Sequence, residues 1–407
     1  MTTDKKNTLK QLYPEDILSI AKGLTDGEVA LLQQLNDLLE SKYRQDINQH
    51  WVDATVPEDY FQDIGNLNYF TNPLLYQGRE EAKTPSQLPS QLFQFFMSYT
   101  IARFDVSLAT LLGVHQGLGH NTFLFGGSSE QVAKYVPKLQ SHELRTCFAL
   151  TEPNHGSDVA GGLETVAERH GDEWVINGVK KWIGGAHVSD VIPVFAVNKD
   201  TGKPHCFVVR PDQEGVEIEV LQHKIALRIV PNAEIRLNHV KVKEADRLQN
   251  ITSFKDIAKI LYSTRAGVAY MATGALAGTL RATLSYVKER QQFGKSISQY
   301  QLIQEKLAMI QGNLTHAMAM SAQLARMQEN GEYDEVATST AKMMNALRLR
   351  ESVAMGRGIT GGNGILAGEH DIARFFSDAE AIYTYEGTHE MNALVIGRAL
   401  TGVSAFV

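Results

Sequence analysis

Apolar side chains recur at helical spacing through the first third of the chain. Thr25-Asp26-Gly27-Glu28 is a capping-box pattern, and leucines follow it at three- and four-residue intervals. Residues 50–88 show no clear period, and the helical pattern returns near Gln91. Ser128 to Gln131 is a second capping-box pattern, opening a helix that we expect to end before Pro137. The pattern predicts a helical N-terminal domain over residues 1–145.

The period changes from helical to alternating near Thr146. Two alternating runs, 174–176 and 179–183, flank Asn177-Gly178, which is the strongest short signal for a β-hairpin. Further runs of this kind predict strands at 191–197, 206–209, 216–220 and 235–242. We therefore expect a central antiparallel β domain over residues 146–253.

From Phe254 the helical pattern continues to the end of the chain. One stripe of apolar and small residues has helical spacing: Ile303, Leu307, Ile310, Leu314, Ala317, Ser321 and Leu324. Glycine-containing turns at 293–294, 330–331 and 361–364 separate long helices. The pattern predicts a C-terminal helical domain over residues 254–407. The expected fold class is α+β, mostly α, in three modules.

Composition narrows the function. The net charge of -7 lacks the basic excess that is typical of a nucleic-acid surface. Two cysteines, Cys147 and Cys206, are too few for a disulfide framework or a cysteine-rich zinc site, and they fit a reducing compartment. The thirteen histidines form no cluster with metal-ligand spacing. No run reaches the ~20 apolar residues that span a bilayer, and neither end carries a secretory or peroxisomal signal. We expect a cytoplasmic protein without a metal, a nucleic-acid partner or an integral membrane segment.

Three polar segments are candidates for chemistry. The loop 151–158 follows a predicted strand, and it can hold an anion or a heteroaromatic ring or be an ordinary surface loop. The glycines at 361–364 can cradle a phosphate or end a helix, and they lack the spacing of a known phosphate loop. Glu386 comes just before a predicted helix at 388–400. A helix N-terminus favours its anion and burial favours its neutral acid, so the residues alone leave its role open.

Taken together, these segments resemble the acyl-CoA dehydrogenase family, strongly over 90–407 and weakly over 25–90. Five stretches carry the resemblance: Leu150-Thr151-Glu152-Pro153-x-x-Gly156-Ser157-Asp158, Lys181-Trp182-Ile183, Glu289-Arg290-x-x-Phe293-Gly294, Gly361-Gly362-Asn363-Gly364 and Tyr385-Glu386-Gly387-Thr388. Within the family, the chain is similar to glutaryl-CoA dehydrogenases and to plant short-chain acyl-CoA oxidases. The latter share Lys224-Ile225-x-Leu227-Arg228 and the segment 383–388.

The resemblance implies an N-terminal helical domain, a central β-barrel-like domain and a C-terminal four-helix bundle, assembled as a homotetramer that binds FAD. The implied reaction is α,β-dehydrogenation of an acyl-CoA thioester, as in fatty-acid β-oxidation. Glu386 matches the base that removes the α proton, while the β hydrogen leaves as hydride to flavin N5. The backbone N–H of the base and a flavin hydroxyl polarise the thioester carbonyl in such enzymes.

Other positions carry over from the resemblance one by one. The residues expected to bind FAD are Phe148, Leu150, Thr151, Gly156, Ser157, Trp182, Ile183, Gly184, Arg290, Gln292, Phe293, Gln301, Gly361, Gly362, Thr388 and Glu390. Among them, Arg290, Phe293 and Gln301 are expected to reach the FAD of a neighbouring subunit. The residues expected to bind substrate are Ser157, Arg265, Tyr385 and Gly387. Arg265 matches a CoA-binding arginine, with a salt bridge inside the bundle as the alternative.

Three departures from the family pattern bear on the substrate and the electron acceptor. Gly184 replaces the usual threonine beside flavin N5, as it does in the plant oxidases. Ala109 stands where glutaryl-CoA dehydrogenases have a carboxylate-binding arginine, which argues against a glutaryl substrate. Gly358 replaces the usual glutamine before the Gly-Gly turn.

These departures leave three hypotheses for the reaction. The first is a dehydrogenase that passes electrons to an electron-transfer flavoprotein. The second is an oxidase that reduces O2 to hydrogen peroxide. The third is a non-catalytic binding protein on the same scaffold.

Overall fold

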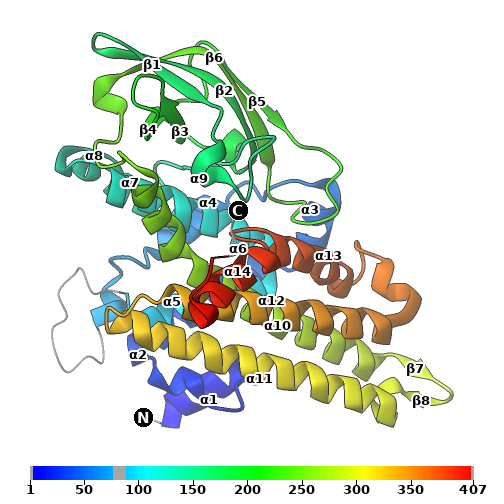
Figure 1. Cartoon of the computed structure of the whole chain (residues 1–407). Helices are drawn as coiled ribbons and strands as arrows, with labels where there is room; N and C mark the ends of the chain where they lie inside the picture. The colour runs from blue at the N-terminus through cyan, green and yellow to red at the C-terminus, as the bar shows by residue number, and fades with distance from the viewer. Residues whose placement is uncertain (1–2, 77–88, 405–407) are drawn as a thin grey trace.

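The computed structural model describes residues 3–76 and 89–404 of the chain. Helices at both ends of the chain pack into one helical body, and a β domain lies above it (Figure 1). The larger N-terminal helices are α1 (Thr3–Leu12), α2 (Asp26–Leu38), α3 (Ile47–Asp53), α4 (Tyr60–Leu67), α5 (Gln91–Phe104), α6 (Val106–Gly113), α7 (His120–Gly126) and α8 (Ser129–Gln140). Two π-helical turns, η2 (Leu39–Tyr43) and η5 (Val114–Gly119), extend α2 and α6.

Both predicted capping boxes are present. The Thr25 side chain accepts a hydrogen bond from the Glu28 backbone N–H at the start of α2, and Ser128 accepts one from Gln131 at the start of α8. The end predicted for the second helix is wrong, because α8 continues through Pro137 to Gln140. A proline this close to a helix end costs one backbone hydrogen bond, and the burial of Leu139 beyond it favours the last turn. The predicted irregular segment 50–88 is described only over 50–76, since residues 77–88 lie outside the described residues. The described part is not wholly irregular, because it holds the end of α3 and the short α4.

The predicted strands are present, but their arrangement differs from the expectation. In the described part of the chain, six strands form one open sheet in the order β4-β3-β1-β2-β6-β5. They are β1 (Val166–His170), β2 (Glu173–Gly184), β3 (Ile192–Asn198), β4 (Pro204–Val209), β5 (Val216–Val220) and β6 (Asn232–Lys243). β1 pairs with β3 in parallel, so the sheet is mixed and not purely antiparallel. The edge strands β4 and β5 do not meet, so the sheet is not closed into a barrel.

The predicted Asn177-Gly178 hairpin is wrong. β2 runs straight through both residues, and the turn lies instead at 171–172, between β1 and β2. Opposite Asn177, β6 carries one extra residue, and the His239 backbone N–H donates to Asn177 Oδ1 at 2.8 Å. Gly178 has φ 153°, and a Cβ there would lie 2.5 Å from Thr165 Oγ1. Asn177-Gly178 therefore forms an irregularity inside a strand. Such an irregularity, like a hairpin turn, needs a backbone conformation that glycine adopts easily.

The C-terminal helices form the bundle. They are α10 (Phe254–Glu289), α11 (Gln301–Glu329), α12 (Glu335–Thr360), α13 (Asp371–Thr384) and α14 (His389–Thr401), with a small hairpin of β7 (Gln291–Gln292) and β8 (Lys295–Ser296) between α10 and α11. α10 packs against α5, α11, α12 and α13. The predicted stripe on α11 is confirmed over 310–324, where its side chains are buried.

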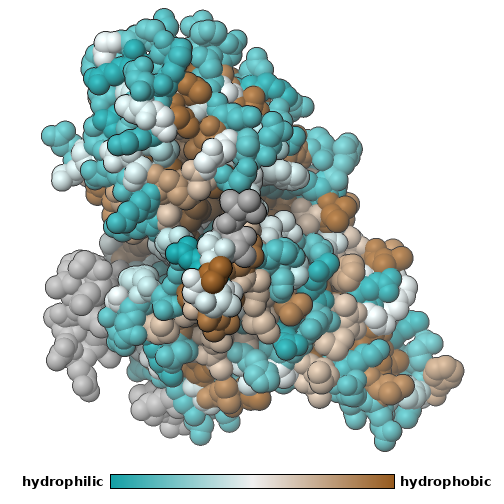
Figure 2. Space-filling view, viewed as in Figure 1, coloured by the Kyte–Doolittle hydropathy of each residue, from teal (hydrophilic) through white to brown (hydrophobic). Residues whose placement is uncertain are grey.

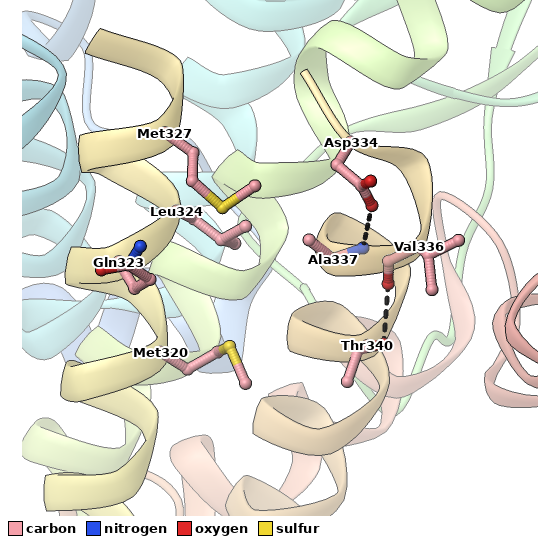
Figure 3. Close-up of a pocket in the computed structure, with 8 residues that line it drawn as sticks. All are labelled: Met320, Gln323, Leu324, Met327, Asp334, Val336, Ala337 and Thr340. Carbon is pink, nitrogen blue, oxygen red and sulfur yellow. Dashed lines mark hydrogen bonds between the residues drawn. The ribbon is translucent and has the colours of Figure 1, made fainter. Parts of the chain in front are cut away.

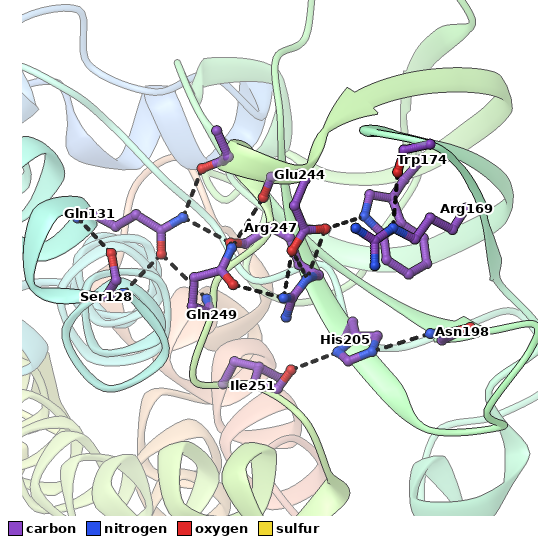
Figure 4. A network of polar contacts seen from close by, with 12 residues as sticks. Ser128, Gln131, Arg169, Trp174, Asn198, His205, Glu244, Arg247, Gln249 and Ile251 are labelled. Carbon is purple, nitrogen blue, oxygen red and sulfur yellow. Dashed lines mark hydrogen bonds and ion pairs between the residues drawn. The ribbon is translucent and has the colours of Figure 1, made fainter.

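Two polar networks join the modules. Gln131 of α8 donates to the carbonyls of Ala245 and Arg247, and Arg247 pairs with Glu244, which also accepts from the Trp174 indole (Figure 4). In the second network, Asp378 of α13 accepts from Trp51 Nε1 at 2.9 Å, Ser107 Oγ at 2.8 Å and the Leu227 backbone N–H at 2.7 Å. Asp378 thus ties all three modules together at the segment 224–228.

Candidate active site

Glu386 lies in the short turn between α13 and α14. Glu386 and Gly387 both have positive φ, 52° and 92°. Oε2 of Glu386 accepts a hydrogen bond from Thr264 Oγ1 of α10 at 2.9 Å. Lys342 of α12 donates to the carbonyls of Tyr383 at 3.1 Å and Gly387 at 2.6 Å, on either side of Glu386. Two helices that are distant in sequence, α10 and α12, therefore hold this turn.

The electrostatics of Glu386 combine opposing effects. Burial raises the pKa of its carboxyl group, while the Thr264 hydroxyl and the cations of Arg265 and Lys342 oppose that rise. Burial lowers the pKa of the Lys342 ammonium to about 8, against the attraction of Glu386. A carboxylate that is partly desolvated in this way is a stronger base than one in water.

The predicted substrate residues adjoin this turn. The Tyr385 hydroxyl lies 3.3 Å from Thr110 Oγ1 and 4.0 Å from Met271 Sδ. Arg265 Nη1 donates to Ser339 Oγ at 2.9 Å and lies 3.6 Å from Glu335 Oε1. The second contact is the salt bridge inside the bundle that is the alternative to CoA binding by Arg265. The buried Nε of Arg265 has no hydrogen-bond partner among the described residues.

The first predicted FAD segment is attached to β2. Lys180, a fully buried residue of β2, donates to the Leu150 carbonyl at 3.1 Å and pairs with Glu152 at 2.7 Å. The Lys181 backbone N–H donates to the Thr151 carbonyl at 2.9 Å. The adjoining Phe148 ring packs on Phe195 of β3, 4.9 Å between centroids. Gly156 and Ser157 follow in an exposed loop.

The second predicted segment is the end of β2. Trp182 has φ 65° and is 57% exposed, although it is a large aromatic residue. Ile183 instead points into the core of the β domain. A Cβ on Gly184 would lie 3.3 to 3.4 Å from Val230, Asn232 and Val114. Because the Lys180 contacts come just before Trp182, the two predicted FAD segments lie side by side.

The turn η5 connects these segments to Glu386. Val114, at its start, is the neighbour of Gly184, and a Cβ on Gly117 would lie 3.4 Å from Thr264 Cγ2. Thr264 in turn donates to Glu386. The residues predicted to face the flavin and the predicted base therefore converge on the same π-helical turn.

A second group of predicted residues lies at the other end of the bundle. Arg290, Gln292, Phe293, Gln301, Gly361 and Gly362 line one pocket of about 760 Å³. Phe293 sits at the tip of the β7–β8 hairpin with φ 53° and is 94% exposed. Figure 2 shows apolar patches on this end of the bundle. A Cβ on Gly361 or Gly362 would meet nothing within 4 Å, so the backbone here is open to a ligand.

The two groups are far apart within one chain. Thr264 and Glu289, the residue before Arg290, lie in the single helix α10. Their separation along the helix is about 38 Å at about 1.5 Å per residue. Thr388 and Glu390 lie with the first group, at the start of α14, where the Thr388 side chain accepts from the Met391 backbone N–H at 3.2 Å.

Three residues that hydrogen-bond to the Glu386 turn were not singled out from the sequence. They are Thr264, Lys342 and Asn392, whose Nδ2 donates to the carbonyls of Gly387 and Thr388 at 2.9 Å. Lys342 did carry a signal, because it falls on the buried face of α12 together with Ser339, Asn345 and Leu349.

A further pocket of about 450 Å³ lies between α11 and α12 (Figure 3). It is mostly apolar, with Met320, Leu324 and Met327 on one side and Ala337 on the other. It contains none of the site residues predicted from the sequence. Within residues 3–76 and 89–404, no cluster of three or more His, Cys, Asp or Glu side chains is suited to a metal ion, and no helix is long and apolar enough to cross a membrane.

Three family models match the chain in order. They are the N-terminal domain of acyl-CoA dehydrogenase over residues 25–143, its middle domain over 147–240 and its C-terminal domain over 254–401. A 3-(aryl)acrylate reductase of Clostridium sporogenes is 35% identical over 68% of this chain and 74% of its own length. The caffeyl-CoA reductase–Etf complex subunit CarC of Acetobacterium woodii is 31% identical over 75% of this chain and 82% of its own. A crystal structure of glutaryl-CoA dehydrogenase from Mycobacterium smegmatis in complex with FADH2 has a TM-score of 0.88 and 27% identity, covering 97% of this chain and 99% of that one.

Proposed function

Because the chain belongs to the acyl-CoA dehydrogenase family and is an FAD-dependent oxidoreductase, we propose that it converts an acyl-CoA thioester to the trans-2-enoyl-CoA, with Glu386 as the base. The observation that carries this proposal is the environment of Glu386. Its carboxylate is partly buried, is held by Thr264 and lies near the cations of Arg265 and Lys342. It is also close to the segment where the flavin ring is expected.

The chain's own residues account for the proton side of the reaction. The α C–H of a thioester is weakly acidic, and Glu386 removes that proton onto its carboxylate. The backbone N–H of Glu386 polarises the thioester carbonyl, which stabilises the charge that develops there. Tyr385, next to Glu386, is the residue we expect on the substrate side of the site, and its hydroxyl lies 3.3 Å from Thr110 Oγ1. When bound, FAD supplies the oxidant that accepts the β hydrogen as hydride.

The described residues fit FAD at two places. The exposed ring of Trp182 and the segment 148–157 offer an aromatic surface and hydroxyls for the flavin end. The pocket at the bundle end offers Arg290 and the open backbone at 361–362 for the phosphates or the adenosine. Thr264, next to the expected flavin site, and Glu289, next to Arg290, are about 38 Å apart along α10. This distance is longer than an extended FAD molecule reaches. Arg290, Phe293 and Gln301 therefore serve the FAD of a neighbouring copy, and we propose a homotetramer built on that exchange.

The reduced flavin must pass its electrons to an acceptor. We propose an electron-transfer flavoprotein for this role, supported by the CarC relative, whose name places it in a complex with Etf. We propose three domains with limits at 1–145, 146–253 and 254–407.

The cytoplasm is the proposed location of the protein. Both cysteines are buried and free, which fits a reducing compartment.

A second candidate is an acyl-CoA oxidase, because Gly184 replaces the usual threonine beside flavin N5 as it does in the plant oxidases. The structure agrees with a glycine at this position, since three neighbouring side chains already crowd the space that a Cβ would take. Purified protein mixed with acyl-CoA in air distinguishes the two candidates. Rapid, stoichiometric peroxide without an added carrier would establish the oxidase and overturn the flavoprotein acceptor.

The base assignment is tested by Glu386→Gln, which keeps the shape of the side chain and removes its basicity. We expect the variant to retain FAD and to bind acyl-CoA, while anaerobic acyl-CoA no longer bleaches the flavin. A panel of acyl-CoAs of graded length, tried on the unmodified protein, identifies the preferred chain. Bleaching of the variant at the unmodified rate would overturn the assignment.

A further inference from the structure

Lys342 is a lysine inside the bundle with a completely buried side chain. Its ammonium donates to the Tyr383 carbonyl, in the last turn of α13, and to the Gly387 carbonyl, just before α14. These two carbonyls bracket Glu386. Lys342 therefore spans the ends of the turn that carries the proposed base.

The turn needs such support because of its backbone conformation. A left-handed φ is unfavourable for a residue with a Cβ, and Glu386 has φ 52°. The Lys342 contacts fix both ends of the turn, and Asn392 adds a second donor to the Gly387 carbonyl at 2.9 Å. A cation also suits the Tyr383 carbonyl, since the C-terminal end of a helix is partly negative.

The charge of Lys342 acts on Glu386 as well. The charged groups that face Lys342 are Glu386 on the turn, Arg265 on α10 and Glu390 on α14. Lys342 and Arg265 both favour the ionised form of Glu386, against the effect of burial. A buried ammonium is expensive, and an apolar side chain of similar size is often the more stable choice at such a position. Core stability alone therefore does not explain a lysine here.

We propose that Lys342 is a positioning residue for Glu386, which fixes the turn 383–387 and places a positive charge near the carboxylate. The inference rests on the proposed role of Glu386 as the base. Lys342 itself touches neither substrate nor cofactor in this role.

The test compares Lys342→Gln and Lys342→Arg with Asn345→Ala, a matched control. Asn345 is also buried on α12, but its side chain reaches Thr273 of α10 and Ser321 of α11 instead of the turn. Two readouts are used on holoprotein across pH 5 to 9. One is anaerobic bleaching of the flavin by acyl-CoA. The other is exchange of the C2 hydrogens of acetyl-CoA with D2O, which reports proton removal alone because acetyl-CoA has no β hydrogen. FAD content and the Kd for acetyl-CoA are measured alongside.

We expect Lys342→Gln to slow both processes about tenfold at pH 7 and to shift the acid limb of each profile up by about one pH unit. FAD content and the Kd for acetyl-CoA stay within about twofold, because Lys342 touches neither ligand. Lys342→Arg keeps the charge and the donors, so we expect it to recover the rate to within about threefold. Asn345→Ala lowers the thermal midpoint but leaves the rate and the limb in place.

An unchanged rate and an unmoved limb in Lys342→Gln would overturn the inference, and so would an equal loss in Asn345→Ala. If the glutamine variant does not hold FAD, Lys342→Arg decides. A folded, FAD-bound arginine variant that has lost tenfold or more refutes the role of the charge, and one that keeps the rate supports it. Glu386→Gln separates the two proposals, because normal exchange in that variant sinks the base assignment whatever Lys342 does.

Discussion

Thr264→Val is the sharpest perturbation of the proposed base, because it removes one donor and keeps the shape of the side chain. Thr264 Oγ1 lies 2.9 Å from Glu386 Oε2. A hydrogen bond to a charged group contributes about 1.5 to 3 kcal/mol. The same hydroxyl also lies 3.1 Å from the Leu261 carbonyl, and its single hydrogen can serve only one acceptor at a time. The lower end, about 1.5 kcal/mol, is therefore the appropriate magnitude.

This magnitude sets the size and the direction of the expected shift. One pKa unit corresponds to about 1.4 kcal/mol, so losing the donor moves the pKa of Glu386 by about one unit. The hydroxyl favours the ionised carboxylate, so its loss raises that pKa. Below the limb the variant works about tenfold more slowly, and above it the two proteins react at similar rates.

The assay is anaerobic bleaching of the flavin, followed as initial rates from pH 5 to pH 9. The control is Thr279→Val, further along α10, whose buried hydroxyl donates to the Ala275 carbonyl at 2.8 Å and does not contact the site. We expect its limb to stay in place, although its thermal midpoint falls. A limb that does not move in Thr264→Val, or that moves to lower pH, would refute the placement of Thr264 against the base.

Two further predictions concern other parts of the chain. Arg265→Ala is expected to raise KM for CoA esters about tenfold with a smaller change in kcat, since a binding contact is lost; an unchanged KM in steady-state assays would leave Arg265 as a bundle residue only. Burial lowers the pKa of His115 to about 4, below its unfolded value of about 6.5, so its contribution to stability is present above pH 6.5 and is lost as the pH falls toward 4. The full loss is about 3 kcal/mol. Urea unfolding at pH 7 and at pH 5 measures the drop in the free energy of unfolding, and we expect a smaller drop for His115→Gln than for the unmodified protein. Equal drops in the two proteins would contradict this prediction.

The parts of the fold that could be predicted are those with long periodic patterns. The start of α5 at Gln91 and the long helices after Phe254 follow the helical spacing, because many turns repeat the same signal. α4 was missed because eight residues make only about two turns. Its buried residues Tyr60, Phe61 and Ile64 form no longer stripe.

The errors in the β domain have a common cause. Local residues specify a conformation but not a partner, and glycine with positive φ serves a hairpin and a strand irregularity equally well. The parallel pairing of β1 with β3 depends on how the chain returns after β2, which no local pattern encodes. The openness of the sheet likewise follows from its edge strands β4 and β5, which lie far apart in the order.

Candidate site residues divide in the same way. Those inside short motifs, such as Trp182, Phe293 and Glu386, could be named because the motif is contiguous. Thr264, Lys342 and Asn392 come from three different helices, and only the packing of those helices brings them to one turn. The sequence also could not show that the named residues form two groups at opposite ends of α10.

Backbone strain offers an independent view of those two groups. Trp182, Phe293 and Glu386 all have left-handed φ values, 65°, 53° and 52°. Such values are uncommon outside glycine, asparagine and aspartate, and each costs roughly 1 kcal/mol or more. Trp182 and Phe293 recover little of this through burial, because they are 57% and 94% exposed. A strained backbone that presents an exposed aromatic ring brings no benefit to folding, whereas it places the ring against a ligand or a second chain. Ten described residues other than glycine have positive φ, and among them Trp182 and Phe293 are the two that are Trp, Tyr or Phe. One lies in each proposed FAD-binding surface, so the combination of strain and an exposed aromatic ring selects the same two positions as the motifs do.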